Sequence, residues 1–146
     1  MVGCHIAHDC VIRDGVIMAN LATLAGHVEV EDDAVFGGFV ALHQFSRVGR
    51  TVMVAAGTKL PRDAPPYSLV GGDPPRFVGL NRVGLKRIGM SPDTKKAIRR
   101  AYRLIFAKGV RLEQGLIRAE SEFGEVPEVR HTIDFIRGSR RGIIRE

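Results

Sequence analysis

A six-residue period runs through the first sixty residues and constrains the fold more than any other feature of the chain. Every sixth residue from Ile6 to Leu60 is large and apolar, and every sixth residue from Cys10 to Thr58 is small or β-branched. The first series is Ile6, Ile12, Met18, Leu24, Val30, Phe36, Leu42, Val48, Val54 and Leu60. The second is Cys10, Val16, Ala22, Val28, Ala34, Val40, Ser46, Val52 and Thr58. A period of six does not match the roughly 3.6 residues of an α-helical turn, so amphipathic helices are excluded here.

This repeat predicts a parallel β-helix, in which short strands meet at fixed corners. The large residues would fill the interior, and the small ones would fit where the interior narrows. Three hexapeptides per triangular coil give 18 residues a turn, and the coils would stack about 4.8 Å apart. The period stops at Pro66, within Ala64-Pro65-Pro66. We therefore assign residues 1–82 to a β-helix that ends in an irregular connection, which includes Gly71-Gly72-Asp73-Pro74-Pro75.

Residues 83–146 are predicted to form a small helical domain. We expect a short helix over about 83–88 and a second that begins after Ser91, an N-cap residue followed by proline. Apolar stripes predict two further helices, over about 112–123 and 127–137. The basic tail that follows, residues 137–142, is expected to be mobile.

The positive charge of the chain belongs to its C-terminal half. The formal net charge is +6, but residues 1–82 carry 7 Lys or Arg against 8 Asp or Glu, and residues 83–146 carry 15 against 8. An acidic partner for this half would explain the excess, and so would a solvated basic helix face. We do not expect nucleic-acid binding, because the chain has two tyrosines and neither an RNA-binding signature nor a helix-turn-helix pattern.

Other features of the composition indicate a cytoplasmic protein. No stretch approaches the twenty apolar residues of a membrane span. The N-terminus, MVGCHIAHD, has neither a basic segment nor an apolar run typical of a secretion signal. The two cysteines, six residues apart, are expected to be free thiols in a reducing compartment.

The 18-residue coil places chemically active residues in one corner strip. His8, Gly26 and Gln44 are 18 residues apart and would form a column. His27 and Phe45 would form the next column, beside Asp9, and His43 directly precedes Gln44. Histidines 8, 27 and 43 would therefore gather along one corner although they are far apart in sequence.

Three interpretations of this strip are open from the residues alone. His8 has the parts of a general base with Asp9 as its carboxylate partner, and the backbone N–H of Gly26 could stabilise an oxyanion. His8 could equally be a polar surface residue of a coil. A zinc site formed by His5, His8 and His27 is a less favoured alternative, because glycine and glutamine in the same column suit contacts with a substrate better than ligation.

Several segments resemble one known family. They are HIAHDC at residues 5–10, LATLAGHV at 21–28, GG at 37–38, HQF at 43–45 and GLKRIGMS at 84–91, followed by the helices. In this order they are similar to the acyl-[acyl-carrier-protein]–UDP-N-acetylglucosamine O-acyltransferases of lipid A biosynthesis. The resemblance implies a left-handed parallel β-helix, a C-terminal α-helical bundle and a cytoplasmic homotrimer with active sites between subunits. It also implies acyl carrier protein and UDP-N-acetylglucosamine as partners.

The same resemblance implies the roles of individual residues. His8 matches the general base, Asp9 its carboxylate partner, and the Gly26 N–H the oxyanion donor. The substrate-contacting positions of the family match His5, His27, Gln44, Asn81 and Arg87. An (R)-3-hydroxyacyl chain would pass directly from the carrier thioester to the 3-hydroxyl of the sugar, without metal, cofactor or covalent acyl-enzyme.

The chain also departs from the family pattern. Val83 stands where a carboxylate is usual, and Ile88 where a second basic residue is usual, so the acceptor could instead be an amino-sugar nucleotide. Coils that correspond to roughly the first two-fifths of the family's chain are absent, so Met1 is expected to be an internal methionine. An inactive or partial trimeric β-helix is therefore an alternative to an active enzyme. The length of the acyl chain is left open, although Ala55 and Ala56 are expected to line its pocket.

Overall fold

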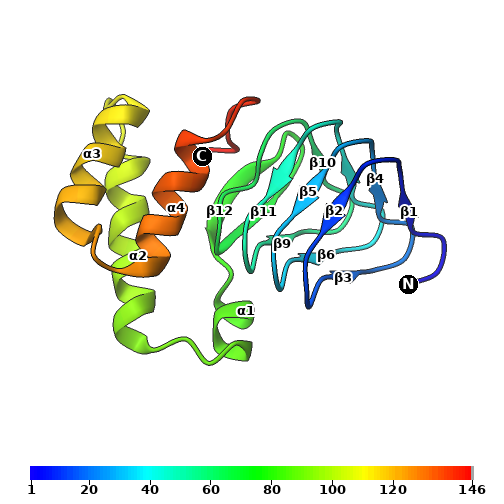
Figure 1. Ribbon diagram of the computed structural model, residues 1–146, viewed down its shortest axis with the longest axis horizontal. Coiled ribbons are helices and arrows are strands. Elements are labelled where there is room, and N and C mark those ends of the chain that lie inside the picture. Colours follow the sequence, from blue (N-terminus) through cyan, green and yellow to red (C-terminus); the bar gives the residue numbers. More distant parts are fainter. Residues whose placement is uncertain (146) are drawn as a thin grey trace.

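The computed structural model describes residues 1–145, and a parallel β-helix forms their first part (Figure 1). Ten strands of two residues each follow one another at six-residue intervals. They are β1 (His5–Ile6), β2 (Val11–Ile12), β3 (Ile17–Met18), β4 (Thr23–Leu24), β5 (Glu29–Val30), β6 (Val35–Phe36), β7 (Ala41–Leu42), β8 (Arg47–Val48), β9 (Met53–Val54) and β10 (Lys59–Leu60). Strands eighteen residues apart pair in parallel, as His5 does with Thr23. The predicted 18-residue coil is confirmed.

Three sheets form the sides of the β-helix. The first contains β1, β4, β7 and β10, the second β2, β5 and β8, and the third β3, β6 and β9. The second residue of each strand points inward, so the large series lines the interior, and Leu24, Phe36 and Val54 are fully buried. The small series lies beside it, with Ala22, Val40 and Ser46 completely buried. Both predicted series therefore have the predicted positions.

The corners between the sheets depend on a third series, which the sequence did not reveal. One residue in each of the ten hexapeptides has a positive φ, between 55° and 74°. These residues are Gly3, Asp9, Gly15, Leu21, His27, Asp33, Phe39, Phe45, Thr51 and Gly57. This left-handed conformation favours glycine, but the corner imposes it on other residue types as well. Because so few of the ten are glycine, the series has no clear signature in the sequence.

The connection after the last regular coil is more ordered than expected. Residues Ser68–Gly71 form strand β11, which extends the third sheet through parallel pairing of Leu69 with Met53. The chain then reverses into β12 (Arg76–Leu80), which pairs antiparallel with β11. The expected irregular connection is therefore confined to the turn at residues 72–75, between two strands that were not predicted. The reason is that this last coil is two residues shorter, since Leu69 lies sixteen residues after Met53, and the six-residue period no longer identifies it.

The helices begin and end close to their predicted limits. They are α1 (Arg82–Arg87), α2 (Pro92–Ile105), α3 (Leu112–Phe123) and α4 (Pro127–Arg137). The Ser91 hydroxyl accepts a hydrogen bond from the Thr94 N–H, as expected for the N-cap of α2. None of the helices in residues 1–145 is long and apolar enough to cross a membrane. Both cysteines are free, as predicted.

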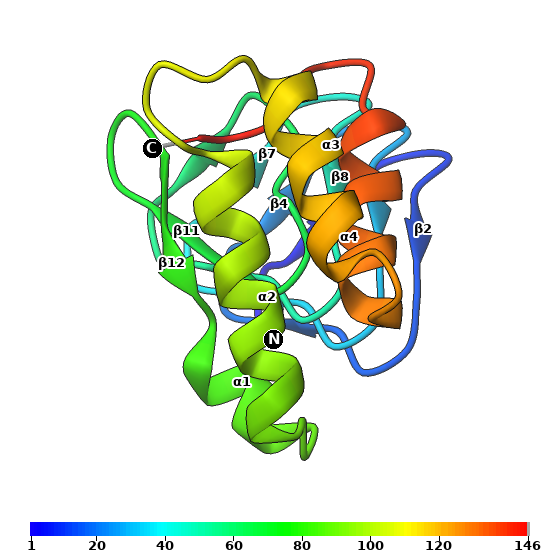
Figure 2. The ribbon, with the colours of Figure 1, turned by 90° about the vertical axis from the view of Figure 1, so that its left-hand side faces the viewer.

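Helices α2, α3 and α4 cover one end of the β-helix (Figure 2). The Tyr102 hydroxyl donates to the Pro66 carbonyl at 2.5 Å, and the Arg47 guanidinium donates to the carbonyl of Phe135 and lies over its ring. An ion-pairing contact of 2.7 Å joins His131 of α4 to Glu31 of the β-helix. The helical domain is therefore fixed to the coils by polar contacts as well as by its apolar core.

The C-terminal tail, expected to be mobile, is instead attached to the last coil. Ile143 and Ile144 are buried, and Ile144 joins the core of the β-helix. The Arg141 guanidinium donates two hydrogen bonds to the Pro61 carbonyl. The basic composition of the tail suggested a solvated segment, but its two isoleucines gain from burial and hold it in place.

Candidate active site

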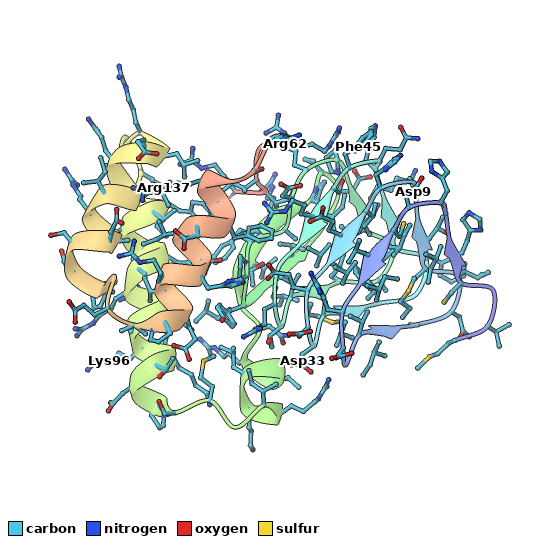
Figure 3. All side chains as sticks on the ribbon, in the orientation of Figure 1. Asp9, Asp33, Phe45, Arg62, Lys96 and Arg137 are labelled. Atoms are coloured by element: carbon cyan, nitrogen blue, oxygen red, sulfur yellow. The ribbon has the colours of Figure 1, made fainter. Side chains whose placement is uncertain are left out.

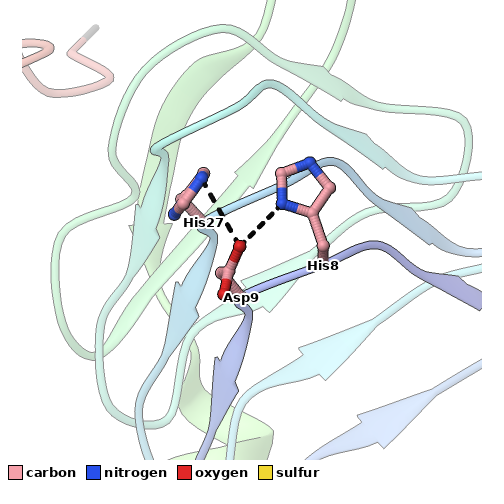
Figure 4. Close-up of side chains that lie close together, drawn as sticks. All are labelled: His8, Asp9 and His27. Atoms are coloured by element: carbon pink, nitrogen blue, oxygen red, sulfur yellow. Dashed lines mark hydrogen bonds and ion pairs between the residues drawn. The ribbon is translucent and has the colours of Figure 1, made fainter.

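His8, Asp9 and His27 meet at the corner between the first and second sheets (Figure 4). The Asp9 carboxylate lies 2.8 Å from Nδ1 of His8 and 3.7 Å from Nε2 of His27. The two imidazoles meet edge to face, with their ring centres 5.0 Å apart. One carboxylate therefore faces two histidines from successive coils, as the 18-residue register predicted.

The corner conformation makes this contact possible. Residues next to each other in an extended strand point to opposite faces, which would separate His8 from Asp9. The positive φ of Asp9, 58°, turns the chain at this point and brings its carboxylate back to the neighbouring imidazole. The His27 N–H donates to the carbonyl of His8 at 3.0 Å, which fixes the next coil directly against this corner.

Gly26 makes room for the imidazole of His8. A Cβ atom placed on Gly26 would lie 2.7 Å from both Cε1 and Nε2 of that ring, closer than real contacts allow. Any larger residue would therefore push the ring away from its present position. The N–H of Gly26 has no acceptor among the hydrogen bonds of residues 1–145, so it is free to interact with a bound group.

The electrostatics of the corner keep Asp9 ionised. The hydrogen bond with His8 lowers the pKa of the Asp9 carboxyl below its ordinary value, and the electrostatic effect of the nearby His27 imidazole lowers it further. Because Nδ1 of His8 faces this carboxylate, the proton of a neutral imidazole is favoured on Nδ1. That tautomer leaves Nε2 of His8 as a free base.

Phe45 extends the site by one more coil. Its ring stacks on the imidazole of His27, with ring centres 4.7 Å apart and planes 7° from parallel. The side chain is nevertheless largely exposed to solvent. The sequence placed Phe45 beside this column but assigned it no function, since the register alone does not show that the two rings stack.

The three side chains also form a possible cation site. Their ligand atoms lie within 4.8 Å of one another, and two imidazoles with one carboxylate are a donor set that zinc accepts. The group is not the His5, His8 and His27 set considered from the sequence, because His5 faces outward from β1 and lies outside it. All three side chains are well exposed, so a cation there would be open to solvent.

The remaining predicted residues lie in two other places. Gln44 is exposed in the coil after His27, directly before Phe45, and the carbonyl of Gln44 contacts Nδ1 of His43. Asn81 and Arg87 line a groove of about 560 Å³ on the third sheet. The third sheet is the side opposite the corner that carries His8, so one chain does not bring these two sets together.

Asn81 has a clear structural role within its own chain. Its side chain is buried, accepts a hydrogen bond from the Gly84 N–H as the N-cap of α1, and donates to the carbonyl of Thr51. These contacts fix α1 along the third sheet. Arg87, in the last turn of α1, is exposed, lines the same groove and has no ion-pair partner within residues 1–145.

Comparison with known proteins finds one family. Residues 63–144 match the family described as UDP N-acetylglucosamine O-acyltransferase, domain 2. An acyl-[acyl-carrier-protein]–UDP-N-acetylglucosamine O-acyltransferase of Anaeromyxobacter dehalogenans is 41% identical over 99% of this chain and 56% of its own length. The enzyme of the same name from Alkalilimnicola ehrlichii is 43% identical over 97% of this chain and 55% of its own length.

Solved structures give the same result. The UDP-N-acetylglucosamine acyltransferase of Bacteroides fragilis superposes with a TM-score of 0.95 at 40% identity, over 98% of this chain and 56% of its own. The Arabidopsis enzyme superposes with a TM-score of 0.92 at 38% identity, over 97% of this chain and 53% of its own. The fold class predicted from the hexapeptide repeat is confirmed by this likeness. The chain spans about half the length of the curated relatives it matches. Over that half it belongs to the family of the UDP-N-acetylglucosamine O-acyltransferases.

Proposed function

We propose that this chain carries the catalytic corner of an enzyme that transfers an (R)-3-hydroxyacyl chain from acyl carrier protein to the 3-hydroxyl of UDP-N-acetylglucosamine. The observation that carries the proposal is the His8–Asp9 pair, which leaves Nε2 of an exposed imidazole free to accept a proton. The names of the relatives supply the two substrates.

The chemistry needs one base and one oxyanion donor. Nε2 of His8 takes the proton of the sugar hydroxyl as the oxygen attacks the thioester carbonyl. The new C–O bond gives a tetrahedral oxyanion, which the free N–H of Gly26 stabilises. The C–S bond then breaks, and the leaving thiolate receives the proton from His8. Asp9 accepts the Nδ1–H bond throughout and stabilises the imidazolium that forms.

The acceptor side is proposed to come from a neighbouring subunit. Asn81 and Arg87 lie on the side of the β-helix opposite His8, so a substrate held by both sets must lie between two chains. The third sheet and the adjoining helix α1 have apolar side chains suited to such contact: Val78 of β12 and Val83 of α1 are 64% and 71% exposed, and Ile17 of β3 also faces solvent. A homotrimer would repeat this contact three times with closed symmetry.

Mixed oligomers test the shared site directly. His8→Ala should lower the rate of acyl transfer by about 10²- to 10⁴-fold, because the base is lost. Arg87→Ala should raise the KM for the sugar nucleotide strongly. When the two impaired variants are co-expressed, random assembly gives about a quarter of the sites both an intact His8 and an intact Arg87, and these sites are active at sugar-nucleotide concentrations below the raised KM. Transfer of the acyl group from hydroxyacyl carrier protein to labelled UDP-N-acetylglucosamine is the measurement.

The outcomes of this experiment separate the parts of the proposal. Recovery of activity in the mixture supports a site between subunits, and its absence would contradict that arrangement. Full activity of the His8→Ala protein would refute the base assignment. An unmodified protein that forms trimers but transfers no acyl group would favour the inactive fragment. Comparison of UDP-N-acetylglucosamine with its 3-amino analogue decides between ester and amide formation.

A cation site is the second candidate function, favoured by the cluster of His8, Asp9 and His27. A bound zinc ion would supply an activated water or polarise a carbonyl at this corner. Titration of the protein with zinc, followed by the imidazole resonances of His8 and His27, tests this candidate. Stoichiometric binding that Asp9→Asn abolishes would support it, and unchanged resonances would exclude it.

A further inference from the structure

A groove of about 630 Å³ leads from the candidate active site to the C-terminal tail. His27 and Phe45 line its beginning, Glu29 and Arg47 of the second sheet line its length, and Arg140 and Arg141 stand at its far end with Asp63 and Gly138. Figure 3 shows the same direction: Asp9, Phe45 and Arg62 lie in order along one edge of the β-helix, toward the tail. The groove is thus continuous with the corner that carries the histidines.

The tail is held rigidly where it meets this groove. The Ser139 hydroxyl donates to the buried Asp63 carboxylate at 2.6 Å, and the Asp63 N–H donates to the carbonyl of Gly142. The Arg141 guanidinium is oriented by its two hydrogen bonds to Pro61. Arg140 lies between these anchors and is exposed. The basic segment is therefore positioned in advance and loses little conformational freedom when a ligand binds.

The charges of the groove leave an unbalanced positive end. Glu29 lies 3.7 Å from Arg47, so these two charges offset each other. The Asp63 carboxylate is buried and accepts hydrogen bonds from Ser139 and from the N–H of Arg47. No ion pair within residues 1–145 involves Arg140 or Arg141. Arg140 and Arg141 therefore line the end of the groove without an ion-pair partner among these residues.

We propose that Arg140 and Arg141 form a subsite for a phosphate ester of one of the two substrates, with Arg140 as the main contact. Guanidinium groups bind phosphate oxygens through paired, charge-assisted hydrogen bonds. This subsite rests on the proposed function, in which the donor's carrier arm holds a phosphodiester and the acceptor holds a diphosphate. Either phosphate in the groove would place the rest of its substrate toward His27.

Binding of unreactive probes tests the subsite without turnover. The probes are pantetheine 4′-phosphate for the donor and UDP for the acceptor, titrated into the full chain by calorimetry. Arg140→Gln should weaken one of these probes about tenfold, the effect of one charge-assisted hydrogen bond. Arg140→Lys should lose less affinity than Arg140→Gln, because lysine keeps the positive charge but lacks the planar guanidinium group. Pantetheine, which lacks the phosphate, should bind both proteins equally.

A matched control removes the same charge elsewhere. Arg118 is an exposed arginine on α3, outside the groove, so Arg118→Gln changes the net charge equally and should leave both affinities unchanged. Weaker pantetheine 4′-phosphate binding assigns the subsite to the donor, and weaker UDP binding assigns it to the acceptor. If Arg140→Gln weakens neither probe, or if Arg118→Gln weakens them equally, the subsite is refuted. Absence of acyl transfer with intact probe binding would instead refute the proposed function.

Discussion

The two ends of the β-helix contain the same kinds of residues in opposite environments. In the first coil, Ile6 of the large series is 49% exposed. At the last coil the tail closes the interior, and Ile144 is only 4% exposed. Leu60, the last residue of the large series, is 2% exposed. What the last coil adds is the tail packed against it, so the repeat specifies the coil and a segment outside the repeat completes the core there.

The aspartates of one corner show the same contrast. Asp9 and Asp63 both lie between the first and second sheets, at opposite ends of the β-helix. The Asp9 side chain is 65% exposed and faces two imidazoles. The Asp63 residue is 1% exposed and binds a backbone N–H and a serine hydroxyl. An exposed carboxylate is available for chemistry, whereas a buried one with filled hydrogen bonds fixes structure.

Truncation of one isoleucine at each end should sharpen this contrast most. Ile144→Ala removes buried methyl groups from the core under the tail and should lower the free energy of unfolding by about 3 kcal/mol. Ile6→Ala removes a half-exposed side chain and should cost less than about 1 kcal/mol. Urea denaturation of the two variants gives both values. Equal losses would show that the first coil is covered in solution.

Removal of the exposed carboxylate should affect catalysis and leave stability unchanged. Asp9→Asn removes the partner that orients His8 and stabilises its charged form, so turnover should fall about hundredfold. The urea midpoint should stay the same, because the side chain is exposed and packs little. A variant that loses stability but retains turnover would reverse the assignment of the two aspartates.

Removal of the buried carboxylate should have the opposite result. Asp63→Ala leaves the N–H of Arg47 and the Ser139 hydroxyl without their acceptor, and should cost about 2 kcal/mol of unfolding free energy. Faster proteolysis within residues 138–145 would report release of the tail. Ser139→Ala serves as the milder comparison, since it removes one of these hydrogen bonds. Resistance of the tail to protease in both variants would contradict its attachment through Asp63.

The smallest expected effect concerns the ion pairs between helices α3 and α4. Glu120 of α3 accepts hydrogen bonds from Arg130 and Arg137 of α4, and these lower the pKa of its carboxyl. A lowered folded-state pKa stabilises the protein above the ordinary carboxyl pKa, and this contribution is lost as the pH falls through the lowered value. Glu120→Gln should therefore be slightly less stable near neutral pH and equal to the unmodified protein in strong acid. Thermal unfolding against pH gives this difference, and a gap that widens in acid would contradict the assignment.

Much of the fold could be predicted because the coil repeats. Each hexapeptide has its inward-pointing residue at the same position. The register of His8 with Gly26 and of Asp9 with His27 therefore followed from counting eighteen residues. Helices α3 and α4 were predicted at their observed limits, since apolar stripes are local signals. The close approach of Gly26 to the His8 ring was not predicted, because it depends on a side-chain orientation.

The departures in backbone structure occur where the period ends. Strand β11 pairs sixteen residues back, and the tail returns across some eighty residues of sequence to bind Pro61 and Asp63. No repeat or local propensity reports a contact of that range. The basic residues of the tail suggested a solvent-exposed segment, whereas burial of the two isoleucines that follow them determined its position.

The sequence by itself determined the β-helix, its 18-residue register and the presence of a histidine–carboxylate corner, because these depend on short, repeated patterns. Only the tertiary structure decided what each group in that corner does. It turned Asp9 back to His8 through a left-handed corner residue, placed Asn81 and Arg87 on the opposite side, and directed Arg140 and Arg141 into the groove. These positions depend on contacts between segments far apart in the chain, which exist only after the coils have stacked.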